Sequence, residues 1–380
     1  MTAILKQESF LLIAFGFAIL SYLFEHTLLE QGQFVSMIAA CALIVVIVMA
    51  STRVAHHAEV LAHKVGDPYG TMILTLSAVA VEVLILAIMM GSSSSPTLVR
   101  DTIYSAVMLD INGILGLAAL LGGLRHGEQP YNDDSSRTYS AMILTTMGIS
   151  MIVTEFIPEA KWHYYSAFTI FAMVALYALF LKMQVGTHSY FFSYSYRGQA
   201  TAAATSSVGS TAASTHAPPK PAAETEGEQE SATLSIAIIL VGVLIIGVLA
   251  EFMSAFMNEG LEGTGAPPAL MAVVVASISA APEILTALRA ALKNRMQSVV
   301  NIAMGASLST VILTVPVMEA IALYTGQPFL MAMTPVQTVM VAITLIVAAI
   351  NLNDGQTNAI EGMTHFVLFA TFVMLTFLGL

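Results

Sequence analysis

Long apolar runs separated by short polar stretches make up most of the chain, and their lengths predict helices that cross a membrane. The hydrocarbon core of a bilayer is about 30 Å thick, so a spanning α-helix needs roughly 20 predominantly apolar residues. Eleven segments come near this length: 9–25, 33–50, 69–91, 102–124, 139–157, 164–183, 233–253, 267–290, 298–323, 335–350 and 360–379. The pattern therefore predicts an all-α polytopic membrane protein with about 11 transmembrane helices.

Composition supports the same class. Hydrophobic residues make up 57% of the 380 residues, and charged residues only 10%. Soluble domains carry about 25% charged residues, so a soluble protein is excluded. The apolar run near the N-terminus has no small-residue cleavage pattern after it, and we expect it to be a retained helix.

One polar segment, residues 191–232, interrupts the apolar pattern. It is rich in Ala, Ser, Thr and Pro, and cannot bury enough apolar surface to fold, so we expect a disordered tether. A regulatory or ion-buffering role is the alternative, because four acidic residues gather at its end: Glu224, Glu226, Glu228 and Glu230. The segment divides the chain into an N-terminal helix, two sets of five helices and the linker: residues 1–30, 31–190, 233–380 and 191–232.

The positions of Lys and Arg predict the orientation in the membrane. If the eleven spans alternate, eleven of the 13 basic residues fall on the side of the N-terminus. Only Arg100 and Lys161 fall on the other side. Because basic loops stay in the cytoplasm, the N-terminus and the linker are expected to be cytoplasmic and the C-terminus external.

The two sets of five helices each carry a glutamate at the same depth of their second helix. Glu82 follows Pro68 by fourteen residues, and Glu283 follows Pro268 by fifteen. At 1.5 Å per residue, each carboxyl group lies about 20 Å along its helix, near the middle of the bilayer. Each set crosses the membrane five times, an odd number, so the second set begins on the opposite side of the membrane from the first. The two sets therefore have opposite orientations. This predicts one helix plus two inverted five-helix repeats, an arrangement typical of secondary transporters.

A carboxylate at the centre of a spanning helix costs about 2.5–3.5 kcal/mol, so two at matched depth indicate a binding site for protons or a cation. Pro282 cannot donate a hydrogen bond to the carbonyl of Ile278, which leaves that oxygen beside Glu283. Ser279 lies one turn before Glu283 on the same face. Carboxylate, carbonyl and hydroxyl oxygens suit a hard cation such as Ca²⁺ or Na⁺. The alternative is that both glutamates are neutral and hydrogen-bond between helices.

Other polar residues inside the spans are supporting candidates. Asp110 could be a third carboxylate, or a packing or gate residue, and Asn112 beside it could instead serve close helix approach. Asn301, Gly305 and Ser309 recur every four residues, so they share one helix face and are either ligands or packing residues.

Two further groups of titratable residues are expected to be solvated. His56, His57 and His63 fall in a predicted cytoplasmic loop, where the alternative to simple solvation is a pH sensor. The second group lies near the external ends of spans, where interfacial water would solvate the side chains: Glu155, Glu251 and Glu319.

Several stretches resemble the calcium/proton exchanger family of the cation/calcium exchanger superfamily, in particular the ChaA-type bacterial sodium (potassium), calcium/proton antiporters. They are "PYGTMILTLSAVAVEV", "SAAPEILTALRAALKNRMQSVVNIAMGASLSTVILTVPV" and "NDGQTNAIEGMTHFVLFATF". The resemblance implies eleven spans, and it implies that the family's paired essential glutamates map onto Glu82 and Glu283. Gly305 and Ser309 match small and polar positions of the family. In the last stretch, Asn358 and Glu361 also have the spacing of a helix capping box.

These observations predict a secondary cation/proton antiporter that exchanges Ca²⁺, and also Na⁺ or K⁺, for protons by alternating access at Glu82 and Glu283. A Na⁺(K⁺)/H⁺ antiporter without Ca²⁺ transport and a cation channel are the alternatives. No hydrolase or metalloprotease motif is present, so we expect no enzyme activity. The expected partners are inorganic cations, protons and lipid, with no cofactor, no nucleic acid and the oligomeric state left open. The resemblance implies a bacterial inner membrane.

Overall fold

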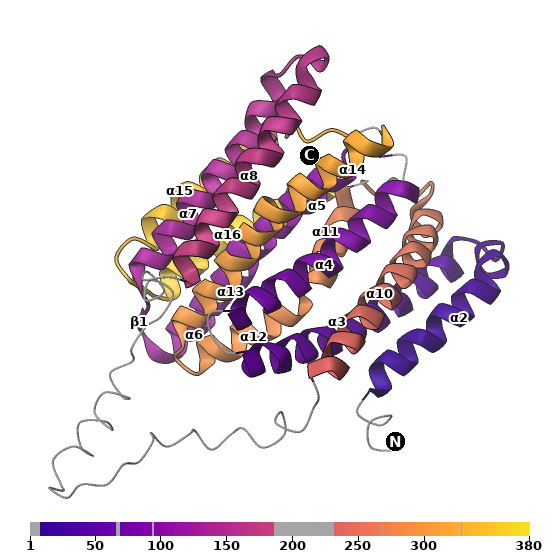
Figure 1. The fold of residues 1–380 in the computed structure, drawn as a ribbon, viewed down its shortest axis with the longest axis horizontal. Helices are drawn as coiled ribbons and strands as arrows, with labels where there is room; N and C mark the ends of the chain where they lie inside the picture. Colours follow the sequence, from indigo (N-terminus) through magenta and orange to yellow (C-terminus); the bar gives the residue numbers. More distant parts are fainter. Residues whose placement is uncertain (1–7, 66–68, 93–94, 186–231, 268, 328) are drawn as a thin grey trace, which may run out of the picture.

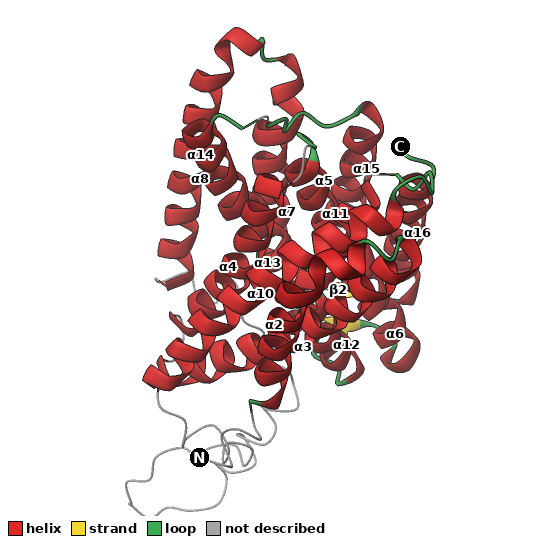
Figure 2. Cartoon of the chain, turned by 90° about the vertical axis from the view of Figure 1, so that its right-hand side faces the viewer, coloured by secondary structure: helices red, strands yellow, loops and turns green. Residues whose placement is uncertain are grey.

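The computed structural model describes residues 8–65, 69–92, 95–185, 232–267, 269–327 and 329–380, and nearly all of them are helical (Figures 1 and 2). The described residues of the first half form six consecutive helical segments, several of them composite: α2 (Ser9–Leu29), α3 (Gln33–Val65), α4 (Tyr69–Ser92), α5–η1–α6 (Leu98–His126), α7–η2–η3 (Asp133–Phe156) and α8 (Trp162–Val185).

The second half contains five, two of which are composite. They are α10 (Ala232–Leu261), α11 and α12 (Ala269–Ser279 and Ala281–Leu292), α13–η7–α14 (Met296–Thr325), α15 (Pro335–Asn351) and α16 (Ala359–Phe377). Each of the eleven predicted apolar segments coincides with one of these helical segments. Eight are long and apolar enough to cross a membrane, one bent pair passes the same test together, and two are shorter apolar helices. Pro68, Pro268 and the linker lie outside the described residues.

Two helices extend well beyond their predicted apolar segments. α3 continues to Val65, fifteen residues past the predicted end, and α10 continues to Leu261. The expectation that His56 and His57 lie in a solvated loop is therefore wrong, because both belong to α3 and His57 is fully buried. His63 also lies within α3. The polar end of α3 remains helical because α10 packs along it, which hydropathy alone does not reveal.

Among the described residues, the buried apolar side chains form two separate clusters. One joins α2, α3 and α10 with parts of α4 and α11. The other joins the helices from α5 to α8 with those from α12 to α16. Figure 1 shows α2, α3 and α10 lying together along one side of the molecule. α4 contributes to both clusters, with Ile85 in the first and Leu86 in the second. The fold thus has two bodies that meet along α4, and the candidate site lies between them.

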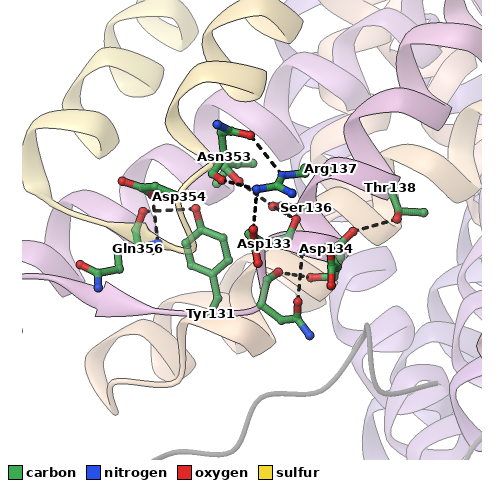
Figure 3. A network of polar contacts seen from close by, with 12 residues as sticks. Tyr131, Asp133, Asp134, Ser136, Arg137, Thr138, Asn353, Asp354 and Gln356 are labelled. Atoms are coloured by element: carbon green, nitrogen blue, oxygen red, sulfur yellow. Dashed lines mark hydrogen bonds and ion pairs between the residues drawn. The ribbon is translucent and has the colours of Figure 1, made fainter. Parts of the chain in front are cut away.

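The body that contains α5–α8 and α12–α16 is called here the larger body. At one of its ends, a short antiparallel pair joins β1 (Gln129–Pro130) to β2 (Gln356–Thr357), and the polar side chains around this pair are called here the clamp. Figure 3 shows the side chains around it. Arg137 donates to the backbone carbonyl of Asn353 at 2.9 Å and forms an ion pair with Asp133. The Tyr131 hydroxyl donates to the Gln356 carbonyl at 3.2 Å, and burial raises the pKa of this tyrosine. The clamp fixes the loop between α6 and α7 against the turn between α15 and α16.

The start of α16 confirms a sequence prediction. The Asn358 side chain accepts hydrogen bonds from the backbone N–H groups of Ile360 and Glu361, at 2.9 and 3.2 Å. It also donates to the Glu361 carboxyl group at 2.8 Å. Asn358 therefore caps the helix, satisfying N–H groups that have no partner within it.

A charged cluster ties α2, α3 and α10 together at the face where α8 ends and α10 begins. Glu8, which precedes α2, pairs with Arg53 and His57 of α3. His57 Nδ1 lies 3.4 Å from Ser235 Oγ on α10. Burial alone would raise the pKa of Glu8, but the hydrogen bonds from Arg53 and His57 and their positive charges hold it below its ordinary value of 4.5. The cluster is therefore most stabilising when Glu8 is ionised.

Because the pKa of Glu8 is lowered in the folded protein, the stability of the fold is expected to depend on pH. A carboxyl group whose pKa is lower in the folded state contributes stability above its unfolded value, and this contribution disappears as the pH falls through the folded value. We expect Glu8→Gln to lower the thermal midpoint at pH 7, by the equivalent of about 1–3 kcal/mol, because Arg53 loses its charged partner. The difference from wild type should shrink below pH 4.5.

Thermal unfolding in detergent at pH 7 and at pH 3.5–4 measures this effect. Glu30→Gln is the matched control, because Glu30 is exposed at the other end of α2. An equal difference between wild type and Glu8→Gln at both pH values would contradict the role assigned to the ionised cluster.

Candidate cation site

A cavity of about 740 Å³ lies between the two bodies and contains most of the polar residues singled out from the sequence. α3 and α4 line it on one side, and α7, α8, α12 and α13 line it on the other. It extends from the middle of the helices to Glu59 on α3 and Gln184 near the end of α8. Gln184 is one residue from the end of α8, and Glu59 follows His57, which lies beside Ser235 at the start of α10. Both residues therefore lie toward the face where α8 ends and α10 begins, called here the linker face; Figure 1 shows these two helix ends.

The paired glutamates both line this cavity. Glu82 is 5% exposed and lies in the unbroken helix α4. Thr310 of the second half donates its hydroxyl proton to Glu82 Oε2 at 2.9 Å. The other oxygen, Oε1, is buried and has no hydrogen-bond partner among the described residues. One half of the Glu82 carboxyl group is therefore available to a ligand.

Glu283 is held differently. The chain bends by 57° between α11 and α12, and Pro282 stands in the first turn of α12. Proline is compatible with a first turn, where its missing N–H would lack a partner anyway. Glu283 lies in the same turn, so the positive end of the α12 dipole lies next to its carboxyl group. Its Oε2 is buried and has no partner within the described parts of the chain. Pro282 thus begins a new helix that presents Glu283 at its N-terminal end, a break that α4 lacks.

Asp110 is a third carboxyl group in the cavity. It lies on η1 (Met108–Leu115), a π-helical stretch inside the α5–α6 span, and is 2% exposed. Ser307 donates to Asp110 Oδ2 at 3.1 Å. π-Helical turns inside α-helices are frequently found at functional sites. η7 (Thr310–Thr314), the π-helical stretch that follows Ser309, carries the partner of Glu82.

The three carboxyl groups line one cavity without converging on a point. Among the described residues, no three His, Cys, Asp or Glu side chains stand close enough to hold a metal ion together. This arrangement is unlike a closed structural metal site. It fits a transported ion, which must leave its ligands as easily as it reaches them.

The structure places the supporting candidates as follows. Asn301, Gly305 and Ser309 all line the cavity, as their common helix face predicted, and so do Ser279 and Pro282. The hydroxyl groups of Ser279 and Ser309 donate to backbone carbonyls three residues earlier, at 3.0 and 2.9 Å, which leaves their lone pairs to the cavity.

Asn112 is the exception. Although only two residues from Asp110, it lies outside the cavity, on the far side of the helix. It donates to Thr344 Oγ1 at 2.8 Å, and its carbonyl oxygen lies 2.9 Å from Nδ1 of His365. Two residues turn a helix by about 200°, so neighbouring polar positions can serve different surfaces. Asn112 joins η1 to α15 and α16 rather than binding an ion.

Sequence reasoning missed the residues that hold the carboxyl groups. Ser307 and Thr310 donate to them from the opposite half of the chain. Their signal was a run of hydroxyl residues inside an apolar helix, "SLST". Tyr139, Tyr177 and Phe180 form an aromatic part of the wall, and nothing in their spacing distinguishes them from core residues.

Comparison with known proteins agrees with this geometry. The family model described as "Sodium/calcium exchanger protein" matches residues 35–186 and 234–378, which leaves out α2 and the linker. The chain belongs to this exchanger family. It is a family of membrane transporters, and both matched regions contain one of the paired glutamates.

Individual relatives cover most of the chain. The sodium-potassium/proton antiporter ChaA of Escherichia coli is 33% identical over 334 residues, covering 87% of this chain and 86% of that protein. The putative ionic transporter y4hA of Sinorhizobium fredii is 28% identical over 374 residues, covering 97% and 95%. Among solved structures, the Ca²⁺/H⁺ antiporter protein YfkE has a TM-score of 0.73 at 17% identity, covering 97% of this chain and 99% of that one, and shares the fold.

Proposed function

We propose that this exchanger is a cation/proton antiporter in which Glu82 and Glu283 bind either the transported cation or protons. The observation that carries the proposal is the pair of buried carboxyl groups, one from each half, each with one oxygen that has no partner among the described residues. An ionised carboxylate without a counter-charge is costly in an apolar surrounding. Each site is therefore occupied by a cation or a proton at every stage, and this requirement couples the two fluxes.

Ca²⁺ is the cation that the cavity favours. Ca²⁺ takes six to eight oxygen ligands and prefers carboxylates. Glu82, Glu283 and Asp110 supply negative charge, and the hydroxyl groups of Ser279 and Ser309 supply further oxygens. A fourth carboxyl group stands toward the mouth, and no Lys, Arg or His lines the cavity among the described residues. Such a cavity concentrates cations before they reach the deeper glutamates.

We further infer that the two halves are inverted repeats, and that the structure is the state open to the linker face. Helices α4 and α11–α12 occupy equivalent places in the chain order and carry the two glutamates. The bias of Lys and Arg supports a cytoplasmic linker face, and the bacterial relatives support a bacterial inner membrane. Movement of the α2–α3–α10 body against the other body would close this opening and open the opposite one.

Reconstitution in vesicles with an imposed pH gradient tests the function. We expect external Ca²⁺ to release protons in a fixed ratio to the Ca²⁺ taken up, because binding of one displaces the other. Release only with Na⁺ or K⁺ would keep the antiport mechanism but replace the substrate. Cation flux that continues without any proton counter-flux would indicate a channel and would refute the proposal.

A further inference from the structure

Another buried carboxyl group lies away from the cavity, on the side that the cavity does not reach. Glu319 lies in the second turn of α14 (Val315–Thr325). It was expected to be solvated near the external end of its predicted span, but it is only 1% exposed. Thr169 of α8 donates to Glu319 Oε2 at 2.6 Å, and Ser166 donates to Oε1 at 3.5 Å. Both hydroxyl residues lie in the first turns of α8, at the end opposite the linker face.

No positive charge among the described residues neutralises Glu319. No Lys, Arg or His in that part of the chain forms an ion pair with it. A neighbouring titratable group is Tyr165, whose hydroxyl donates to the Ile149 carbonyl at 2.6 Å. A purely structural contact between α8 and α14 would need only a neutral amide or hydroxyl. A carboxyl group in this place adds the ability to take up and release a proton.

Two hydroxyl residues lie between Glu319 and the ion site along the same composite helix, α13–η7–α14. Thr310 donates to Glu82, which leaves its lone pairs to accept a proton from elsewhere. Thr314, one turn further, also faces the Glu82 carboxyl group, and its buried Oγ1 makes no hydrogen bond among the described residues. Glu319 follows five residues later. The stretch from Thr310 to Glu319 spans about 13 Å of helix rise, and Glu319 lies about 140° around the helix from Thr314, so water molecules must complete the path between these two side chains.

Thr310, Thr314 and Glu319 extend from the ion site toward the face that the cavity does not reach, where protons need a path of their own. The cavity leads from Glu82 and Glu283 to the linker face, as marked by Glu59 and Gln184. Protons must also reach Glu82 from the opposite face. Of the described residues that continue from Thr310 in that direction, Thr314 and Glu319 are the buried polar ones on this helix. The surrounding side chains of α14 are apolar.

We propose that Glu319 is a proton-relay residue between the face opposite the linker and Glu82. Its carboxylate takes a proton from water at that face. The proton then passes through the intervening water and the hydroxyl groups of Thr314 and Thr310, each of which accepts one proton and donates another. Glu82 receives the last proton as its cation leaves to that same opposite face, so one proton is transferred in total and no electrons move. This inference rests on the proposed antiport.

The test compares two modes of transport in the same vesicles. Exchange of Ca²⁺ for protons needs the relay, whereas exchange of labelled for unlabelled Ca²⁺ does not. We expect Glu319→Gln to slow Ca²⁺/H⁺ exchange by roughly tenfold or more, a smaller effect than the roughly 10²- to 10⁴-fold typical of groups that transfer protons in catalysis. Ca²⁺/Ca²⁺ exchange should stay within about twofold of wild type, because glutamine keeps the volume and can still bond Thr169. Glu319→Asp, which retains an acid, should recover part of the lost rate.

Glu155→Gln is the matched control, because Glu155 is exposed near the same face, just before α8. Equal loss of both modes in Glu319→Gln would overturn the relay and assign the residue to the cation path or to packing. No loss in either mode would also overturn it. Failure of the antiport itself is recognised separately: wild type would show no cation/proton exchange, or Glu283→Gln would leave it intact, and the relay would then fall with it.

Discussion

Glu283→Gln is expected to abolish cation/proton exchange, with a loss of at least about a hundredfold. Glutamine keeps the shape of the side chain but can neither hold a transferable proton nor neutralise a cation. At an effective dielectric constant of 20, a unit charge about 4 Å from the cation contributes about 4 kcal/mol for each unit of cation charge, which exceeds the roughly 2.7 kcal/mol that a hundredfold change requires. The same result is expected for Glu82→Gln, since Glu82 lines the same cavity.

Binding provides a measurement that does not depend on transport. A ligand that binds only the folded state raises its stability by RT ln(1 + [L]/Kd). Ca²⁺ should therefore raise the thermal midpoint of wild type, and this rise should be lost in Glu283→Gln. Without Ca²⁺ the variant should be about as stable as wild type, because the protonated glutamate and the glutamine are both neutral.

Two controls make this prediction sharp. Glu251→Gln removes a carboxyl group from an exposed position on α10 and should leave exchange and the Ca²⁺-induced rise unchanged. Glu283→Asp keeps the acid but withdraws it by one methylene, so coupling should persist at a reduced rate. Normal proton-coupled exchange by Glu283→Gln would remove this residue from the site.

Gly362→Ala should destabilise the protein severely, by about 3 kcal/mol or more, although it adds only one methyl group. A Cβ atom at Gly362 of α16 would lie 2.2 Å from the backbone nitrogen of Leu120 on α6. Gly123 of α6 makes the reciprocal approach, because its Cβ would lie 2.3 Å from the backbone nitrogen of Ala359. Backbone atoms cannot rotate away as a side chain can. The two helices would have to separate along their length.

The consequence extends to the site. Asn112 on η1 contacts His365 on α16, three residues from Gly362, so separation of the helices would break this buried contact. Thermal unfolding and the yield of folded protein in detergent measure the effect. Gly148→Ala is the control, because Gly148 is also helical and has no atom within 4 Å of the added Cβ. Equal stability of the two variants would contradict the close packing of α6 on α16.

Close approach through glycine is a common device between membrane helices, where small residues allow backbones to pack tightly. Here it fixes α16 against the helix that carries Asp110 on its other side. This close packing holds α6 and α16 together within the larger body. The proposed movement of the α2–α3–α10 body can then change access to the site without deforming the carboxyl groups that the larger body holds.

The sequence by itself determined the segments, their order and the pair of glutamates. Apolar runs report spanning helices directly, because a bilayer imposes one length on all of them. A carboxylate in such a run is conspicuous, and Glu82 and Glu283 were paired by depth alone. The shared face of Asn301, Gly305 and Ser309 followed from helical periodicity, and all three line the cavity. The cap at Asn358 was predicted from local spacing because its hydrogen bonds are local.

Only the tertiary structure decided which side chains contact each other and which of them face the cavity. α3 runs to Val65 and buries His57 because α10 and Glu8 cover it, and neither partner is close in sequence. Asn112 turns away from the cavity although Asp110 faces it, and Glu319 is buried by α8 although the end of its predicted span was expected to be solvated. Hydropathy measures how apolar a segment is, whereas burial and hydrogen bonding depend on which helix lies beside it. The hydroxyl groups that hold Glu82 and Asp110 come from the opposite half of the chain, so no local pattern could assign them.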